Sequence, residues 1–373
     1  MLSESLAQAI LAGNITGPEL DTYLNTSEGY KAWGVLLKSR NLPIIFRNPD
    51  ALALLFASGV ALTGLLEING AALAASDSAT EAIAASSGAL LTIVSDASLL
   101  NLWANNTGNK ARMEAQVNAP GSKLVRVDYT SNGSYTYTVP AEGLVALGYF
   151  LTGGGGKGGD AYASRWAGTG GSGAEAVYGF ITSGLPAGGT DINTTIGFQN
   201  QSSTITGIVT AAAGVQGSSS YGDSPGSNLN LGGGSDTGAT PFDTDPLNAL
   251  WQSNTGTRQG GRGGGRSGTN SQPSGGSPGS DGFPGLDGTG GGANGFLNGN
   301  NAGPASGGSG LCSGGGGGAV NQGYGANATT ITTGFGCGGG GAGVGYISRN
   351  SNNFGSNGTK GLGVLHLILG EIA

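Results

Sequence analysis

The sequence predicts a multidomain fold, in which an N-terminal all-α region of short repeated helices precedes a β-strand-framed glycine-rich domain of packed polyglycine or polyproline II helices. Three observations support this prediction. Residues 48–105 repeat a short alanine-rich unit, most of the 79 glycines lie between Gly153 and Gly363, and two apolar segments, 144–151 and 362–369, bracket that glycine-rich tract. We expect four parts, with the bounds 1–47, 48–105, 106–143 and 144–373.

Residues 1–47 carry start and stop signals for short helices. Gly13 ends the first apolar set, Thr16 and Glu19 have the spacing of a capping box, and Ser27 is expected to start a third helix. This part is the least like the rest of the chain. We therefore expect it to be an attachment module.

Residues 48–105 contain an internal repeat of about nine residues, in which small capping residues precede a run of Ala, Leu, Ile and Val. Nine residues of one continuous helix turn through about 900°, which would place successive units on opposite faces. A stack of short capped helices is therefore favoured, and one long buried helix is the alternative. The units are expected to start at Asn48, Ser58, Asn69, Asp77, Ser86 and Ser95.

Residues 106–143 are expected to form a linker and a β-hairpin. The linker covers 106–122, the segments 123–128 and 134–139 alternate as strands do, and Ser131 to Gly133 supply the turn. Three further segments of the glycine-rich domain have strand character, namely 174–181, 191–198 and 203–212.

Two structures are open to the glycine-rich tract. It can be a flexible linker, because glycine loses more freedom on ordering than other residues and buries no side chain. It can also be a bundle of extended three-residue-per-turn helices that exchange backbone hydrogen bonds sideways. Each such bond contributes about 0.5–1.5 kcal/mol net, while ordering one backbone residue costs about 1–2 kcal/mol. Only a dense lattice of bonds balances these terms.

Three features favour the ordered lattice. From Gly276 to Gly291 glycine falls at every third position, with Pro278 and Pro284 between, which is the period of a three-fold helix. The glycine blocks alternate with aromatic-bearing, turn-rich segments, unlike a uniform linker. The two bracketing strands are apolar on both faces and need cover.

Charge and termini limit the function classes. The net charge is −7 and 10% of residues are charged, so the chain lacks the basic footprint of a nucleic-acid-binding protein. The first residues have no basic segment of a secretory signal and include Glu4, and no apolar run approaches the length of a membrane span. We expect synthesis in a cytoplasm and no membrane insertion.

The two cysteines, Cys312 and Cys337, each adjoin a glycine block. Adjacent backbone helices would bring them together, whereas in reducing surroundings they would stay free, small apolar residues. We expect free thiols, and the sequence leaves a bond between them open.

No residue pattern predicts catalysis, a cofactor or a metal site. His366 is the single histidine and lies within an apolar strand, which is typical of a core residue. Residues 155–162 fit one unit of a calcium-binding repeat, but such a roll needs consecutive units. Asp236, Asp243 and Asp245 could supply oxygen ligands to a cation, and solvated turns explain them as well. We expect a non-enzymatic protein.

Candidate binding residues are aromatic side chains set among Ser, Asn, Gly and Thr, a composition suited to recognition because rings give large contact area at little entropy loss. The alternative is that these rings pin the edges of the glycine lattice. Arg258, Arg262 and Arg266 recur every fourth residue and would meet acidic glycans or keep the surface soluble. The aromatic candidates are Tyr221, Phe242, Trp251, Phe283, Phe296, Tyr324 and Phe335.

Residues 48–373 resemble a known family in four places. These are the alanine-rich units of 48–105, the sequence Ser-Tyr-Thr-Tyr-Thr-Val-Pro at 134–140, the glycine block at 153–159, and the closing Gly-Val-Leu-His-Leu-Ile-Leu at 363–369. Together they resemble bacteriophage tail fibre proteins with a glycine-rich domain. The resemblance implies a sandwich of polyglycine helices whose apical loops contact a receptor on the host.

The resemblance implies a receptor-binding tail fibre or tail tip protein of the virion, made in the host cytoplasm. Residues 1–105 would join it to other tail or baseplate proteins, and its loops would bind a host outer-surface protein or glycan. A homotrimer, or one copy capping a trimeric fibre, is expected. The alternatives are a structural tail or baseplate component and a secreted glycine-rich ice-binding or matrix protein, for which the sequence offers no signal peptide.

Overall fold

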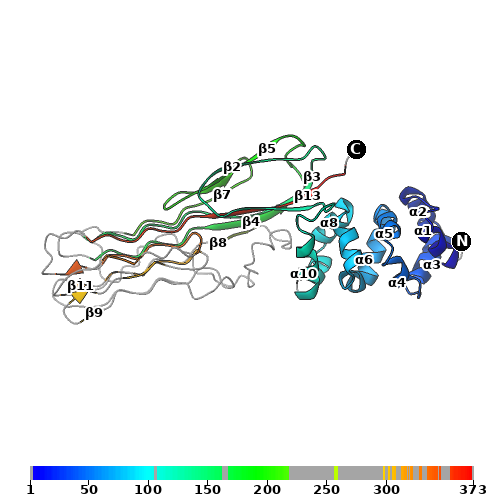
Figure 1. Cartoon of the computed structure of the whole chain (residues 1–373), viewed down its shortest axis with the longest axis horizontal. Helices are drawn as coiled ribbons and strands as arrows, with labels where there is room; N and C mark the ends of the chain where they lie inside the picture. The colour runs from blue at the N-terminus through cyan, green and yellow to red at the C-terminus, as the bar shows by residue number, and fades with distance from the viewer. Residues whose placement is uncertain are drawn as a thin grey trace.

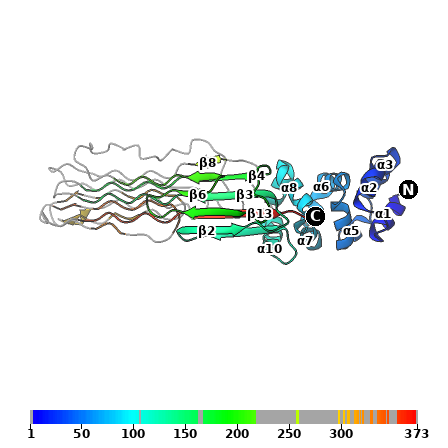
Figure 2. The ribbon, with the colours of Figure 1, turned by 90° about the horizontal axis from the view of Figure 1, so that it is seen from above.

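The computed structural model describes the helical and strand regions almost throughout and the glycine-rich tract in part. Helices occupy one end of an elongated molecule, and the strands and extended segments run away from them along the long axis (Figure 1, Figure 2). The described residues are 3–104, 107–161, 167–217, 256–258, 297–298, 301–302, 305–307, 312–316, 318, 320–321, 327–329, 334–342, 344–345 and 353–371. The protein therefore combines a helical N-terminal region with a β-strand region.

The N-terminal region consists of short helices, as the sequence predicts. The capping box is present, because the Thr16 hydroxyl accepts from the Glu19 N–H and the Glu19 carboxylate accepts from the Thr16 N–H. Gly13 follows the first helix at a φ of 65°. The helices are α1 Ser3–Leu11, α2 Gly17–Leu24, α3 Ser27–Leu36, α4 Leu42–Ile45, α5 Pro49–Phe56, α6 Gly59–Ala74, α7 Asp77–Ala84, α8 Ser87–Ser95, α9 Ala97–Ala104 and α10 Thr107–Gln116.

The repeat is a series of capped helices. Each cap accepts a hydrogen bond from the N–H three residues later, at 3.0–3.3 Å, and this satisfies one of the free N–H groups of the first turn. The caps are Asn48, Ser58, Ser76, Ser86 and Asp96. Helices α5 and α6 meet at a bend of 111°, so the alternative of one long helix is wrong.

The predicted unit start at Asn69 is wrong, because α6 continues through it to Ala74. The Asn69 side chain is used elsewhere and donates from Nδ2 to the Leu37 carbonyl. Gly70 lies against Leu102, where a Cβ would come within 2.8 Å of a methyl group. The contacts of α6 with its neighbours therefore override the local start signal. The predicted starts at Asp77 and Ser95 are each displaced by one residue from the observed caps.

The predicted linker contains a helix. Helix α10 lies within 106–122 and packs against α7, where Arg112 Nε lies 2.8 Å from Asp77 Oδ1. Its Met113 is buried in the helical core. The low apolar content of α10 explains why the sequence does not reveal it.

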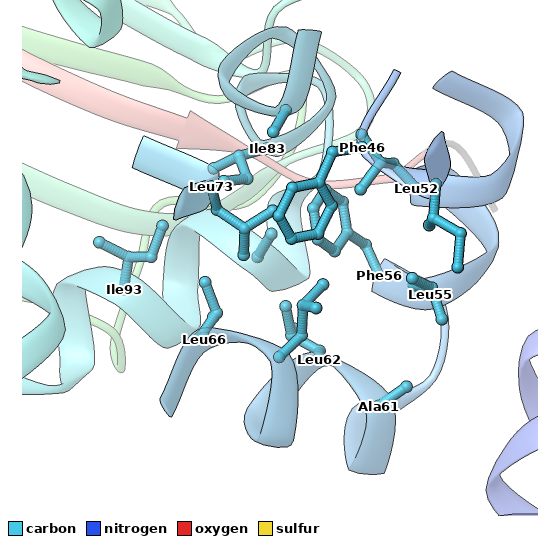
Figure 3. Close-up of a cluster of buried hydrophobic side chains, with 14 of the residues drawn as sticks. Phe46, Leu52, Leu55, Phe56, Ala61, Leu62, Leu66, Leu73, Ile83 and Ile93 are labelled. Carbon is cyan, nitrogen blue, oxygen red and sulfur yellow. The ribbon is translucent and has the colours of Figure 1, made fainter. Parts of the chain in front are cut away.

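Side-chain burial holds the helices together. Figure 3 shows apolar side chains from successive helices converging in one cluster. Burying a large apolar side chain contributes about 1.5–3 kcal/mol. The labelled members are Phe46, Leu52, Leu55, Phe56, Ala61, Leu62, Leu66, Leu73, Ile83 and Ile93.

Two antiparallel sheets form the framework of the second region. The five-stranded sheet has the order β1-β13-β3-β4-β8 and the four-stranded sheet the order β2-β5-β6-β7. The first comprises β1 Leu124–Tyr129, β13 Leu362–Leu369, β3 Leu144–Thr152, β4 Ala176–Ile181 and β8 Gly256–Arg258. The second comprises β2 Gly133–Thr138, β5 Asp191–Ile196, β6 Ser203–Ile205 and β7 Val209–Ala211. Two short pairs are β9 Leu297–Asn298 with β10 Asn301–Ala302, and β11 Val320–Asn321 with β12 Val344–Gly345.

The two bracketing strands lie side by side at the centre of the larger sheet, and both of their faces are covered, as predicted. On one face Leu365 packs against the smaller sheet. On the other face Ile368 packs against the helices. Val364, on the same face, packs against small residues of the glycine-rich tract, including Ala174. All eight residues of β13 are buried.

The predicted hairpin of β1 and β2 is wrong. Strand β1 pairs with β13, and β2 pairs with β5 in the other sheet. Gly133, at a φ of 144°, lets the chain cross between the sheets, and the rings of Tyr129 and Tyr135 stack there with centroids 4.7 Å apart. The apolar β13 needs a hydrogen-bonding partner on each edge, and β1 supplies one of them.

Extended segments of the glycine-rich tract run on from the strands, away from the helices, and exchange backbone hydrogen bonds at 2.7–3.2 Å. These glycine segments are 153–161, 167–175, 212–217, 312–316, 334–342 and 353–361. The spacing of the hydrogen bonds is three residues. Within 153–161, the N–H groups of Gly153, Gly156 and Gly159 donate to carbonyls of segment 167–175. Those of Gly155, Gly158 and Ala161 donate to carbonyls of segment 353–361. A β-strand would instead alternate every two residues.

The same three-residue spacing recurs around segment 334–342. Its N–H groups at Gly338 and Gly341 donate to segment 312–316, and it accepts from segment 167–175 at every third position. The segments approach so closely that a Cβ at Gly158 would fall less than 3 Å from the Gly340 carbonyl oxygen. Glycine is therefore required there for steric reasons.

Candidate functional site

The far end of the glycine segments, opposite the helices, is the best-defined candidate site. The ends of four glycine segments meet there, because the Ala161 N–H donates to the Asn353 carbonyl and the Gly168 N–H donates to the Ala342 carbonyl, both at 2.9 Å. A small apolar cluster of Ala161, Ala167 and Ala342 closes this end. Residues 161, 167–168, 342 and 353 therefore lie close together at this end.

Phe354 is an exposed aromatic residue at this end, and the sequence interpretation missed it. Its side chain is 58% exposed, while its backbone is fixed: the N–H donates to Asn327 Oδ1 at 2.8 Å and the carbonyl accepts from Ala328 at 3.0 Å. It lies between asparagine, serine and glycine residues, the same context that marked the other aromatic candidates. That context is the signal that could have found it.

Most of the predicted binding residues fall outside the part of the chain that the structure describes. Their assignment stays a prediction, as does that of Arg262, Arg266 and the three aspartates considered as cation ligands. The aromatic residues concerned are Tyr221, Phe242, Trp251, Phe283, Phe296 and Tyr324.

The structure places two predicted binding residues. Arg258 ends β8, where its backbone pairs with Ala176. Phe335 is half-buried and packs against the apolar cluster around Phe150, with Lys360 Nζ 5.8 Å from its ring centroid. This position fits the alternative in which a ring pins the edge of the glycine segments.

His366 lies in the core. Burial, followed by the positive charge of Arg126, lowers its pKa from 6.5 to about 3. It faces Arg126 across one strand pair and Gly148 across the other. The imidazole is therefore neutral at physiological pH, as expected for a structural histidine.

Residues that fit one unit of a calcium-binding repeat make other contacts. Lys157 Nζ lies 2.9 and 3.0 Å from the two Asp160 oxygens, and Asp160 Oδ1 also accepts from the Gly355 N–H. These bonds tie two glycine segments together. Among the described residues, no group of three or more His, Cys, Asp or Glu side chains is placed to hold a metal ion.

A second surface lies at the other end of the molecule, between α3 and α6. An apolar groove of about 600 Å³ is lined by Tyr30, Gly34, Val60, Gly64 and Ile68, among others. Residues four apart on each helix line it, as in a groove that receives a further helix. Tyr30 is 74% exposed and Ile68 56%.

No single helix in the described ranges is long and apolar enough to cross a membrane.

A polar joint connects the helices to the strands. The Ser87 hydroxyl donates to the Leu369 carbonyl at 2.6 Å, and the Ser87 N–H donates to Glu371 at 3.2 Å. Lys123 Nζ donates to the Gly370 carbonyl and lies 3.5 Å from the same carboxylate. Burial alone would raise the pKa of Glu371, but the bonds from Ser87 and Lys123 lower it. The end of β13 is thus fixed to the start of α8.

Comparison with known proteins adds no assignment. No protein-family model matches the chain, and no curated protein matches it.

Proposed function

We propose that the chain is a non-enzymatic bacteriophage tail fibre or tail tip adhesin that binds a receptor on the bacterial surface. The observation that carries this proposal is the three-residue spacing of hydrogen bonds between the glycine segments. It supports the resemblance to tail fibre proteins with a polyglycine domain, a resemblance that the sequence motifs suggest on their own.

We infer that these glycine segments pack as polyglycine II helices. A helix with three residues per turn points every third N–H at the same neighbour, which is the pattern of Gly153, Gly156 and Gly159. One such segment can bond several neighbours at once, whereas a β-strand bonds two. The segment 153–161 exchanges bonds with 167–175, 212–217, 334–342 and 353–361.

Such a frame would present loops to a receptor. Each connection leaves a segment whose backbone is bonded on several sides, so its ends are held in place before binding. Preorganised ends reduce the entropy lost on binding. Phe354 and the predicted aromatic residues would supply the contact with a surface protein or glycan.

The helical region would attach the protein to the rest of the tail. Its apolar groove between α3 and α6 fits an apolar helix of a tail or baseplate protein, and the exposed Tyr30 and Ile68 would be covered in that complex. Replacing Ile68 with Asp should then abolish incorporation into particles, whereas replacing the exposed Val35, outside the groove, should not. A homotrimer, or one copy on a trimeric fibre, is consistent with this attachment.

The proposal is tested on purified virions. Antibody raised against residues 150–373 should label the tail in electron micrographs, and labelling confined to other parts of the particle would contradict it. An exchange of residues 216–335 between related phages should move host range with the exchanged segment.

A structural tail component is the second candidate function. The half-buried position of Phe335 favours it, because there a predicted contact residue packs inward. Under this alternative the same exchange of residues 216–335 would leave host range unchanged.

A further inference from the structure

The two cysteines occupy adjacent positions on neighbouring glycine segments. Cys312 N–H donates to the Phe335 carbonyl at 2.8 Å, and Cys337 Sγ lies 3.5 Å from the same oxygen. A Cβ at Gly336 would lie 2.9 Å from Cys312 Sγ. Both sulfur atoms therefore lie beside one peptide unit. Adjacent extended segments lie about 4.8 Å apart, within the Cα separation of about 4.4–6.8 Å that a disulfide spans.

Cys312 has an unusual backbone conformation. Its φ of 55° is left-handed, which is costly for a residue with a Cβ and open to glycine. Gly310 and Gly314 lie two residues away on either side, and a glycine at 312 would adopt this backbone conformation without strain. A cysteine at this position indicates a role for its sulfur atom.

Within the chain, each cysteine has one other cysteine with which it can form a disulfide. The chain contains two cysteines, and both side chains are 0% exposed and form no disulfide in this structure. A buried sulfur cannot reach a second molecule without opening of the fold. Oxidation would therefore join these two residues to each other.

We propose that Cys312 and Cys337 are a disulfide site that closes under oxidising conditions and covalently joins the glycine segments 312–316 and 334–342. The bond would tie together the two ends of the chain stretch that contains Tyr324. The proposal does not depend on the adhesin function.

The reaction needs an oxidant, and a small-molecule disulfide such as oxidised glutathione supplies it. One cysteine thiolate attacks the glutathione disulfide, forms a mixed disulfide and releases one glutathione thiolate. The second cysteine thiolate then attacks the protein sulfur and releases the other. Two S–H bonds and one S–S bond are lost, one protein S–S bond is formed, and two glutathione thiols are produced.

Burial controls when the bond forms. Burial raises the pKa of the Cys337 thiol to about 11, and burial together with the charge of Cys337 raises the pKa of Cys312 well above its ordinary value. The attacking thiolate is therefore scarce in the folded protein. Closure should be slow in the native state and fast during folding or local opening.

The test uses the full chain, purified with reductant and then unfolded and refolded with either dithiothreitol or a glutathione redox buffer. Free thiols are alkylated in denaturant and counted by intact mass. Two alkylated cysteines are expected after dithiothreitol and none after glutathione, with no glutathione adduct. Peptide mapping should then recover a fragment that links Cys312 to Cys337.

A second readout is thermal unfolding of the same two samples. The oxidised protein should melt higher by on the order of 5 °C, and dithiothreitol should remove the difference. The matched controls are Cys312→Ala and Cys337→Ala, whose melting temperatures should not respond to dithiothreitol. Two alkylated thiols, glutathione adducts, or dimers linked through these cysteines after refolding with glutathione would overturn the proposal.

Discussion

The helical region and the glycine segments are stabilised in opposite ways. In the helices, large side chains such as Leu65 fill a core and each helix satisfies its own backbone. In the glycine segments the buried side chains are small, such as those of Ala174 and Ala342, and backbone groups are satisfied by neighbouring segments. A Cβ added at Gly34 in the helices meets no atom within 4 Å, whereas a Cβ added at Gly158 meets the backbone of the neighbouring segment. Side-chain burial thus stabilises one part of the chain and backbone pairing the other.

The largest expected effect is that of a side chain placed inside the glycine segments. Gly158→Val should destabilise them by more than about 3 kcal/mol, because the added atoms meet the Gly340 carbonyl, a backbone group that cannot rotate away. Thermal unfolding of this region and its protease resistance measure the loss. Gly34→Ala in α3, with nothing within 4 Å of the added Cβ, should instead stabilise the helices by about 0.5–1 kcal/mol. Equal effects of the two changes would contradict a difference in packing between the two regions.

A cavity in the helical core should have the next largest effect. Leu65→Ala removes a fully buried side chain and should lower the free energy of unfolding by about 2–5 kcal/mol. Denaturant unfolding followed by the helical circular dichroism signal measures it. The protection of the glycine segments should not change, and a parallel loss there would show that both regions depend on one core.

His366 should make the strand region sensitive to acid. Its pKa is about 3 when folded and 6.5 in its ordinary environment, so between these values the unfolded state binds a proton that the folded state does not. Stability should therefore fall as the pH drops below 6.5, by on the order of 2 kcal/mol at pH 5, with no contribution above pH 6.5. The variant His366→Gln should lose this pH dependence between pH 7 and 5. An unchanged pH profile would contradict the buried neutral state.

The smallest expected effect is the loss of one cap. Ser86→Ala removes the acceptor of the Ala89 N–H and should cost about 1 kcal/mol. Ser86→Asp keeps the acceptor and should cost little. Comparison of the two by thermal unfolding separates the cap from the loss of a hydroxyl.

Local features were predictable from the sequence, and partners distant along the chain were not. The caps at Ser58 and Ser86 depend on residues within one turn, so the pattern predicted them. The pairing of β1 with β13 joins residues more than 200 positions apart, and a good turn at Ser131 to Gly133 favoured the wrong partner. The apolar faces of β13 correctly predicted that it is covered.

The candidate site could be predicted only by composition. Polar sequence around aromatic residues marked candidates, but the same pattern includes Phe335, which packs inward, and Phe354, which is exposed. Which of two such rings faces solvent is decided by the neighbouring segments. The order of the glycine segments likewise follows from backbone geometry, which side-chain patterns do not record.

Amide hydrogen exchange of the glycine segments tests the central claim most directly. We expect the N–H groups of Gly155, Gly156, Gly158 and Gly159 to exchange at least about 100-fold more slowly than in an unstructured peptide, because each donates to a neighbouring segment. The exposed turn at Gly207 supplies an internal reference for fast exchange. Exchange of the four glycines at the rate of an unstructured peptide would contradict the account.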